Sequence, residues 1–131
     1  MRLEVQVDSE LPAVRLSQPL FSMAFAQLIN NSLKFSKNRS DLVTVSVRST
    51  GDSIAIALVD HGLGIPQEQI PHLFERFEQI DRHTYEQQGS GTGLAIAREL
   101  IRLHGGDIQV KSVLGTGSTF TIQLPAFIDK M

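Results

Sequence analysis

The stretch Ile54-Ala-Ile-Ala-Leu-Val-Asp-His-Gly-Leu-Gly-Ile65 decides the fold of this 131-residue chain. Its first six residues form an unbroken apolar run, which predicts a strand buried on both faces. Asp60 ends the run, and Gly62 and Gly64 follow it in a segment suited to a turn. The sequence therefore predicts a central strand whose far end carries a carboxylate and a glycine-rich loop.

On the N-terminal side of this stretch, apolar and polar residues alternate over residues 3–7 and again over residues 43–47. Both segments are predicted to be strands with one buried face. Between them, residues 18–35 repeat apolar positions at helical spacing, and Pro19 falls in the first turn, where proline is tolerated. The apolar face of this helix comprises Leu20, Phe21, Ala24, Phe25, Leu28 and Ile29.

On the C-terminal side, a second helix is predicted from about residue 93 to residue 103, ending at Gly105-Gly106. Residues 108–112 and 118–124 flank a glycine-rich turn and are typical of a hairpin. The order of elements is then strand, helix, two strands, an irregular middle, helix and two strands. This order predicts a sheet with helices on one face.

Charge is spread evenly along the chain. The 12 basic and 14 acidic residues give a net charge of -2 without blocks of one sign, so composition gives no indication of a nucleic-acid-binding surface. Phosphate recognition would have to be local.

Cysteine is absent, which excludes disulfides, cysteine-type zinc sites and thiol catalysis, and suits a reducing cytoplasm. No apolar run approaches the roughly 20 residues of a membrane span. We expect a single cytoplasmic domain over residues 1–131 with no direct membrane contact, whose parent protein could itself be membrane-anchored.

The first helix carries a polar stripe, because Gln27, Asn31 and Lys34 share one face at i, i+4 and i+7. Such a stripe is commonly a solvated helix edge. It could instead bind a metal-bound polyphosphate, with an amide oxygen on the cation and the lysine on a phosphate.

The carboxylate of Asp60 also has two readings. An Asp-x-Gly sequence is often only a turn, because both residues tolerate turn conformations. At a strand end beside a cleft, the carboxylate could accept hydrogen bonds from an exocyclic amine such as that of adenine, while Gly62 and Gly64 allow the base to approach the backbone.

The run Gly89-Ser-Gly-Thr-Gly-Leu94 leads directly into the second helix. It offers free backbone N–H groups and a helix N-terminus to phosphates, although a flexible linker has a similar composition. It matches neither the Walker pattern nor the dinucleotide fingerprint. The polar stretch 77–92 around it is predicted to be a long functional loop.

Taken in order, these motifs resemble those of the histidine kinase ATPase family, whose fold is shared with gyrase, mismatch-repair and chaperone ATPases. Residues 28–36 resemble its asparagine box, residues 60–65 and 89–96 its first two glycine boxes, residues 74–77 its phenylalanine box, and residues 115–120 its final glycine box. The resemblance implies an α+β, two-layer α/β sandwich of the Bergerat type, with a mixed, mostly antiparallel sheet.

The resemblance also implies bound ATP and Mg2+, with Asn31 as the metal ligand and Asn31, Lys34 and Gln27 as the catalytic group. Gln27, His61 and Gln79 depart from the residues common in the family. Some relatives carry, in place of Gln79, an arginine that reaches the terminal phosphate, and the resemblance implies Arg76 or Arg82 for that role here. The nucleotide-binding residues it implies are Asn31, Lys34, Phe35, Asp60, Gly62, Gly64, Ile65, Arg76, Gly89, Ser90, Gly91, Thr92, Gly93, Leu94 and Thr119.

The family moves the γ-phosphoryl group of ATP onto a histidine of a separate dimerisation domain, from which a response regulator receives it. None of His61, His72, His83 and His104 has the sequence setting of that acceptor. The resemblance therefore implies a catalytic domain, monomeric in isolation, whose partner is the dimerisation domain of the same parent kinase. Exposed Phe74 and Phe77 are expected to dock against the helices of that partner.

Three alternatives stay open at this point. One is a serine kinase or anti-sigma relative of the same fold, which the phenylalanine box disfavours. Another is a nucleotide-sensing or interaction module without phosphoryl transfer. The third is an unrelated two-layer domain in which five motifs occur in order by chance.

Overall fold

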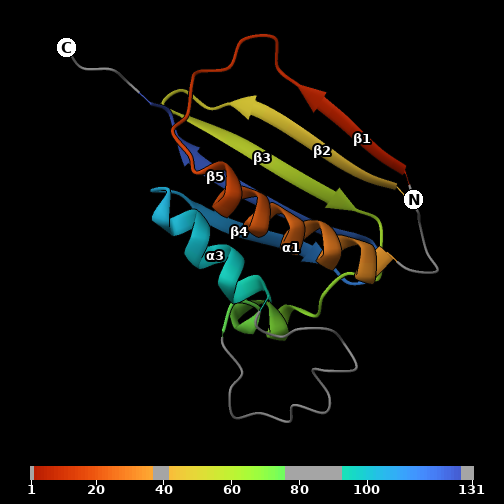
Figure 1. Cartoon of the computed structure of the whole chain (residues 1–131). Helices are drawn as coiled ribbons and strands as arrows, with labels where there is room; N and C mark the ends of the chain where they lie inside the picture. Colours follow the sequence, from red (N-terminus) through yellow and green to blue (C-terminus); the bar gives the residue numbers. More distant parts are fainter. Residues whose placement is uncertain (1, 37–41, 76–92, 128–131) are drawn as a thin grey trace.

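The computed structural model describes residues 2–36, 42–75 and 93–127 (Figure 1). The predicted Gly-rich loop therefore lies mostly outside the described residues. The elements are β1 (Arg2–Val7), α1 (Gln18–Ser36), β2 (Leu42–Ser49), β3 (Ser53–Asp60), the 3-10 helix η1 (Gln67–His72), α3 (Gly93–Leu103), β4 (Asp107–Val113) and β5 (Gly117–Pro125).

The strands form one five-stranded sheet in the order β1-β2-β3-β5-β4. β1 pairs in parallel with β2, and α1 connects the two strands, as a parallel pair requires. The other three pairs are antiparallel. Both α1 and α3 lie on the same face of this sheet (Figure 1). The predicted α+β, two-layer architecture with a mixed, mostly antiparallel sheet is confirmed.

The core lies between the sheet and the two helices. Ala24 and Leu28 of α1 and Ala97 and Ile101 of α3 are fully buried against it, as is Phe120 of β5. The partly buried Phe21, Phe25 and Ile29 pack around these residues, which confirms the predicted apolar face of the first helix. Burying each large side chain contributes roughly 1.5–3 kcal/mol, so this layer of contacts holds the helices on the sheet.

The prediction that β3 is buried on both faces is wrong. Its burial alternates, with Ile54, Ile56, Leu58 and Asp60 buried and the residues between them only partly buried. The reason is that α1 and α3 cover one face of the sheet, and no helix among the described residues lies over the other face of β3 (Figure 1). Alanine at two of these outward positions made the run look uniformly apolar.

The prediction of a buried face on β1 is also wrong. Leu3, Val5 and Val7 are 47%, 58% and 56% exposed. They stand opposite Val43, Val45 and Val47 of β2, on the side of the sheet that carries the helices. However, α1 packs on β2, β3 and β5, and β1 lies at the sheet edge beyond that layer.

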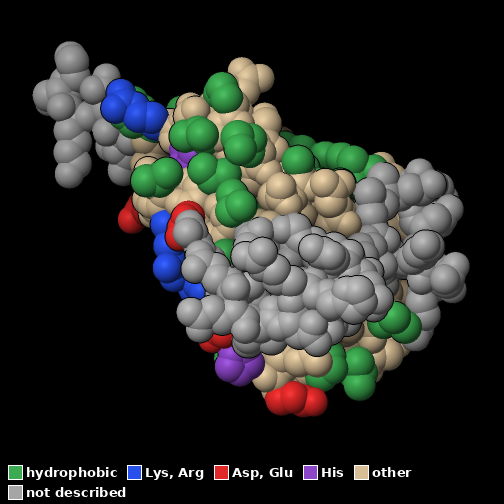
Figure 2. Space-filling view, turned by 60° about the horizontal axis from the view of Figure 1, so that its bottom comes forward, with side chains coloured by type: hydrophobic (Ala, Val, Ile, Leu, Met, Phe, Trp, Pro, Cys, Tyr) green, Lys and Arg blue, Asp and Glu red, His purple; other side chains and the backbone are tan. Residues whose placement is uncertain are grey.

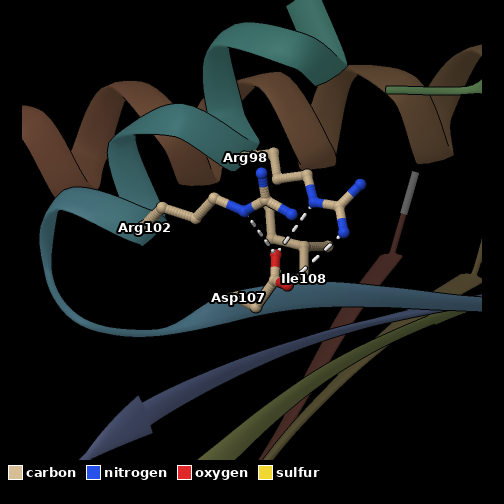
Figure 3. Close-up of polar contacts among 4 residues, drawn as sticks. All are labelled: Arg98, Arg102, Asp107 and Ile108. Carbon is tan, nitrogen blue, oxygen red and sulfur yellow. Dashed lines mark hydrogen bonds and ion pairs between the residues drawn. The ribbon is translucent and has the colours of Figure 1, made fainter. Parts of the chain in front are cut away.

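The second helix ends as predicted. The N–H of Gly106 donates to Ile101 O at 3.1 Å, and Gly105 has φ +83, which together form the glycine-terminated helix end expected there. The helix is then tied to β4 by Asp107, which accepts hydrogen bonds from Arg98 Nε at 2.9 Å and Arg102 Nε at 3.3 Å (Figure 3).

Several hydrophobic side chains remain exposed on the helical layer. The larger ones on α1 and α3 are Met23, Ile96 and Leu103, and exposed hydrophobic side chains gather on this side of the molecule in Figure 2. None of the helices within residues 2–36, 42–75 and 93–127 has both the length and the apolar character of a membrane-spanning segment.

Candidate functional site

The candidate site lies where β3 ends. The loop that follows β3 passes the C-terminal end of α1 and continues to η1, which lies beside the start of α3 (Figure 1). Phe74, just after η1, lies under the guanidinium of Arg98 at 4.9 Å, which fixes this segment against α3. The C-terminal part of α1, Asp60 and the start of α3 therefore lie at one end of the domain.

Asp60 has the most unusual surroundings of the described acidic residues. Its side chain is buried, with 1% of the residue exposed, and Oδ1 accepts a hydrogen bond from the Gly62 N–H at 3.0 Å. Oδ2 is buried and has no hydrogen-bond partner in the part of the chain that the structure describes. Burial raises the pKa of Asp60, against the opposing effects of the Gly62 and Ser118 N–H groups and of His61. A buried acceptor without a partner is costly, so it is a candidate for a ligand donor.

Two glycines let the loop approach Asp60 closely. Gly64 has φ +77, and a Cβ there would overlap the carbonyl oxygen of Val113. Gly117 has φ +143, and a Cβ there would overlap the carbonyl oxygen of Asp60 itself. The loop and the β4–β5 turn also share a hydrogen bond from Gly115 N to Leu63 O at 2.7 Å. Any side chain at either glycine would push these backbones apart.

Two buried serines, Ser112 and Ser118, lie beneath the loop that follows β3, and Ser112 is hydrogen-bonded to it. Ser112 Oγ accepts a hydrogen bond from Ile65 N at 2.7 Å and lies 2.8 Å from Ser118 Oγ. Gln67 Nε2 donates to Ser112 O at 2.6 Å. Sequence reasoning missed both serines, although they occupy inward positions in line with Ile108 and Phe120. A hydroxyl in that alternation was the available signal.

On α1, the structure places Gln27 and Asn31 on the partly buried side of the helix. Asn31 Nδ2 is buried and unpartnered, and so is Ser32 Oγ, which sequence reasoning had not singled out. The oxygen and nitrogen of an amide group can exchange places by a rotation, so Asn31 can present its oxygen to a cation. Lys34 and Phe35 lie in the last turn of α1, but their side chains lie outside the described residues.

Gly93 and Leu94 form the first turn of α3 and are buried. Backbone N–H groups in a first helical turn lack partners within the helix, so this turn suits an anion in the way predicted. The remaining predicted residues, Arg76 and Gly89, Ser90, Gly91 and Thr92, lie outside the described residues. The same holds for the loop predicted over residues 77–92.

Thr119 and Ser118 lie on opposite faces of β5, because side chains alternate along a strand. Ser118 is directly opposite Asp60 in the β3–β5 register and is 3% exposed. Thr119 is opposite Val59 and only partly buried. The structure thus brings Ser118 to the carboxylate, while Thr119, predicted to bind the nucleotide, lies on the other face of the strand.

The expectation that Phe74 is exposed is wrong, because it is partly buried and packs against the core beneath Arg98. Phe77 lies outside the described residues. Of the described histidines, His72 pairs with Glu75 at 3.0 Å at the surface, and His104 accepts a hydrogen bond from Ser17 N at 3.0 Å. These contacts are consistent with structural roles.

Within the described ranges, no three His, Cys, Asp or Glu side chains gather as a potential metal site. An amide oxygen such as that of Asn31 is a ligand of the kind that magnesium takes in proteins, together with water and phosphate oxygens. The side chain of Asn31, whose Nδ2 has no partner among the described residues, and the unpartnered Oδ2 of Asp60 fit a metal–nucleotide ligand.

Known proteins similar to this chain match most of its length. SenX3 of Mycobacterium tuberculosis, a sensor-like histidine kinase, is 40% identical over 130 residues, which cover 96% of this chain and 32% of SenX3. The sensor histidine kinase WalK of Bacillus subtilis is 34% identical over 114 residues, covering 86% of this chain and 19% of WalK. The chain therefore spans a third or less of the length of these relatives.

Among solved structures, full-length ShkA in complex with AMPPNP superposes with a TM-score of 0.78 at 25% identity, covering 95% of this chain and 25% of ShkA. The mycobacterial sensor histidine kinase MprB gives a TM-score of 0.74 at 26% identity, covering 95% and 82%. The family model described as histidine kinase-, DNA gyrase B- and HSP90-like ATPase matches residues 17–128. The chain belongs to this ATPase family, as a domain of the type found in sensor histidine kinases.

Proposed function

We propose that this domain, formed by residues 1–131, binds ATP with Mg2+ and donates the γ-phosphoryl group to a histidine on a separate dimerisation domain of its parent kinase. The observation that carries the proposal is the buried Oδ2 of Asp60, which has no partner and faces a loop closed tightly by Gly64 and Gly117. Membership of an ATPase family supports it.

Adenine recognition is assigned to the end of β3. The exocyclic amine of adenine carries two donors, and Asp60 Oδ2 lacks one. Gly62, Gly64 and Ile65 form the backbone beside it, and Ser118 replaces Thr119 as the strand residue of this wall. A hydrogen bond to a charged acceptor contributes about 1.5–3 kcal/mol, enough for this contact to select the base.

Phosphate and metal binding are assigned to the two helices. Asn31 would hold Mg2+, with Gln27 beside it, while Lys34 and Phe35 would contact phosphate and nucleotide. The first turn of α3, Gly93 and Leu94, would donate N–H groups to phosphate together with Gly89, Ser90, Gly91, Thr92 and Arg76. Bound magnesium would supply charge neutralisation on the phosphates.

The chemical step needs little from this chain beyond positioning and charge stabilisation. A bond forms between an imidazole nitrogen of the partner and the γ-phosphorus. The bond from that phosphorus to the bridging β-phosphate oxygen breaks, and ADP leaves with the electron pair. The phosphoryl group would then pass to a response regulator.

The setting of the reaction is part of the same proposal. The domain would work in the cytoplasm, where ATP is available, and would be monomeric when separated from the dimerisation domain. Membrane contact, if the parent has any, would come from other segments. The curated relatives are much longer than this chain, which supports a parent with further domains.

The test is calorimetric titration with Mg-ATP and Mg-GTP, for the unmutated domain and for Asp60→Asn. We expect saturable binding of ATP, weaker binding of GTP and a marked loss of ATP affinity in the variant. Asp107→Asn is the matched control. Asp107 pairs with Arg98 and Arg102 and lies opposite Gln123 of β5, whereas Asp60 lies opposite Ser118. No binding by the folded, unmutated domain at millimolar ATP would overturn the nucleotide proposal.

Phosphoryl transfer is tested separately. The domain is mixed with a histidine-bearing dimerisation domain and labelled ATP, and acid-labile phosphate is measured on the partner. Transfer is expected only when both proteins are present. ATP binding without transfer to any such domain would favour the nucleotide-sensing module instead.

A further inference from the structure

Ser112 is a buried hydroxyl at the meeting point of three segments. It lies on β4, directly opposite Ser118 of β5, and is 7% exposed. Its Oγ contacts the N–H of Ile65 in the loop after β3 at 2.7 Å, the carbonyl of Gly117 at 2.9 Å and the hydroxyl of Ser118 at 2.8 Å. One side chain thus joins the loop to both strands of the β4–β5 hairpin.

The protons of this cluster can be assigned by elimination. A serine hydroxyl has one proton to donate and two lone pairs to accept. The Gly117 carbonyl can only accept, so the proton of Ser112 goes to it. The Ile65 N–H can only donate and uses one lone pair of Ser112. The contact with Ser118 must then use the second lone pair, so Ser118 donates its own proton to Ser112.

This assignment fixes what Ser118 can offer to a ligand. With its proton committed to Ser112, Ser118 Oγ has only lone pairs left. Ser118 stands opposite Asp60, whose Oδ2 is an acceptor with no partner among the described residues. The wall of the site therefore presents acceptors side by side.

Such a wall distinguishes purines by the group at position 6. An amino group donates to both acceptors, directly or through one water, whereas a carbonyl oxygen would meet their lone pairs. If Ser112 did not hold the Ser118 proton, that hydroxyl could rotate and donate to a carbonyl.

We propose that Ser112 is a positioning residue that fixes Ser118 as an acceptor and thereby strengthens the preference for a 6-amino over a 6-oxo purine; this inference rests on the ATP binding proposed above. Ser112 does not itself touch the base. It acts through Ser118 and, by holding Ile65, through the loop that borders the site.

The experiment compares the dissociation constants of ATP and inosine triphosphate, which carry an amino and an oxo group at position 6 and differ also at N1, an acceptor in adenine and an N–H donor in hypoxanthine. The measured quantity is the dissociation constant of inosine triphosphate divided by that of ATP. In Ser112→Ala this ratio is expected to fall by about tenfold. Ser112→Thr, which keeps the hydroxyl, is expected to retain the unmutated ratio. A role limited to holding the fold would weaken both nucleotides alike and leave the ratio unchanged.

A double-mutant cycle tests the route through Ser118. Ser118→Ala alone should lower the ratio, and adding Ser112→Ala should change it no further. Thr121→Val is the matched control, because it removes a hydroxyl on the opposite face of β5 and should leave the ratio as it was. Should Ser112→Ala fail to fold, Ser118→Ala decides.

The two proposals fail in different ways. If the unmutated domain binds no ATP, the proposed function is overturned and this inference with it. If it binds ATP but the ratio is unchanged in Ser112→Ala or in Ser118→Ala, only the inference is overturned. Equal effects of Ser112→Ala in the presence and absence of Ser118 would also contradict it.

Discussion

Asp60 at the end of β3 and Asp107 at the start of β4 have very different hydrogen-bond partners, although both strands pair with β5. Asp107 stands opposite Gln123 and accepts hydrogen bonds from Arg98, Arg102 and the N–H of Ile108 (Figure 3). The hydrogen bond from Arg98 is the largest cause that lowers the pKa of Asp107 to about 2. Asp60 is buried, has one oxygen without a partner and has a raised pKa.

The difference separates a structural carboxylate from one suited to a ligand. The protein supplies every donor that Asp107 needs, so this residue ties α3 to β4. At Asp60 the protein supplies donors for only one oxygen and leaves the other buried without a partner. The cost of that arrangement is accounted for if a ligand donor completes it.

The largest expected effect is that of Gly117→Ala, which tests how tightly the Asp60 end is built. The new Cβ would overlap the carbonyl oxygen of Asp60, at a backbone conformation that favours glycine. Steric and conformational strain together should cost about 3 kcal/mol or more. Denaturant unfolding measures this loss.

Gly115→Ala is the control for that variant. Gly115 also has a positive φ, but a Cβ there would meet nothing within 4 Å. Its cost should be limited to conformational strain, about 1 kcal/mol. Equal losses in the two variants would show that the close approach at Gly117 is unimportant.

The next effect in size is on binding. Asp60→Asn should weaken ATP by roughly tenfold to a hundredfold, because a charge-assisted hydrogen bond contributes about 1.5–3 kcal/mol. Asp107→Asn should leave ATP affinity unchanged. Calorimetry measures both, and comparable losses in the two variants would remove the distinction between the two aspartates.

The pattern of residues predicted much of this arrangement. Helical periodicity in residues 18–35 and alternation over residues 43–47 were enough to predict a helix packed on a sheet, and Asp60 followed from the end of an apolar run. The exposure of β1 was not predictable in this way, because it depends on which strands the helices cover. Alternation along a strand shows which side chains share one face of the sheet, but it does not show whether a helix covers that face.

The serine cluster escaped prediction for a different reason. Ile65 and Ser112 are 47 residues apart in the sequence, so their hydrogen bond has no local pattern. The resemblance to the final glycine box implied Thr119 and did not single out Ser118, because a motif match gives a neighbourhood rather than a strand register. The register, in which Asp60 faces Ser118, decides which of the two side chains reaches the carboxylate.

The smallest expected effect is the pH dependence of stability, and its sign differs between the two aspartates. The lowered pKa of Asp107 contributes stability above pH 3.8 that is lost as the pH falls towards about 2. Because its side chain is 43% exposed, the contribution should be about 1 kcal/mol or less.

Asp60 should act in the opposite sense. Its raised pKa means that the folded state binds the proton more tightly, so stability is lost as the pH rises from 3.8 through the higher value in the fold. Unfolding free energies of Asp60→Asn and Asp107→Asn, measured between pH 2 and pH 7, should deviate from the unmutated domain in opposite directions. Deviations of the same sign would contradict the assignment.

The most direct test of the account is an NMR titration of backbone amides with Mg-ATP. We expect the amides of Gly62, Ile65 and Ser118 to shift in a saturable manner, while the amide of Ile108 beside Asp107 stays in place. Shifts centred on Ile108, or no shift at Gly62 at saturating nucleotide, would contradict the claim that the Asp60 end is the nucleotide site.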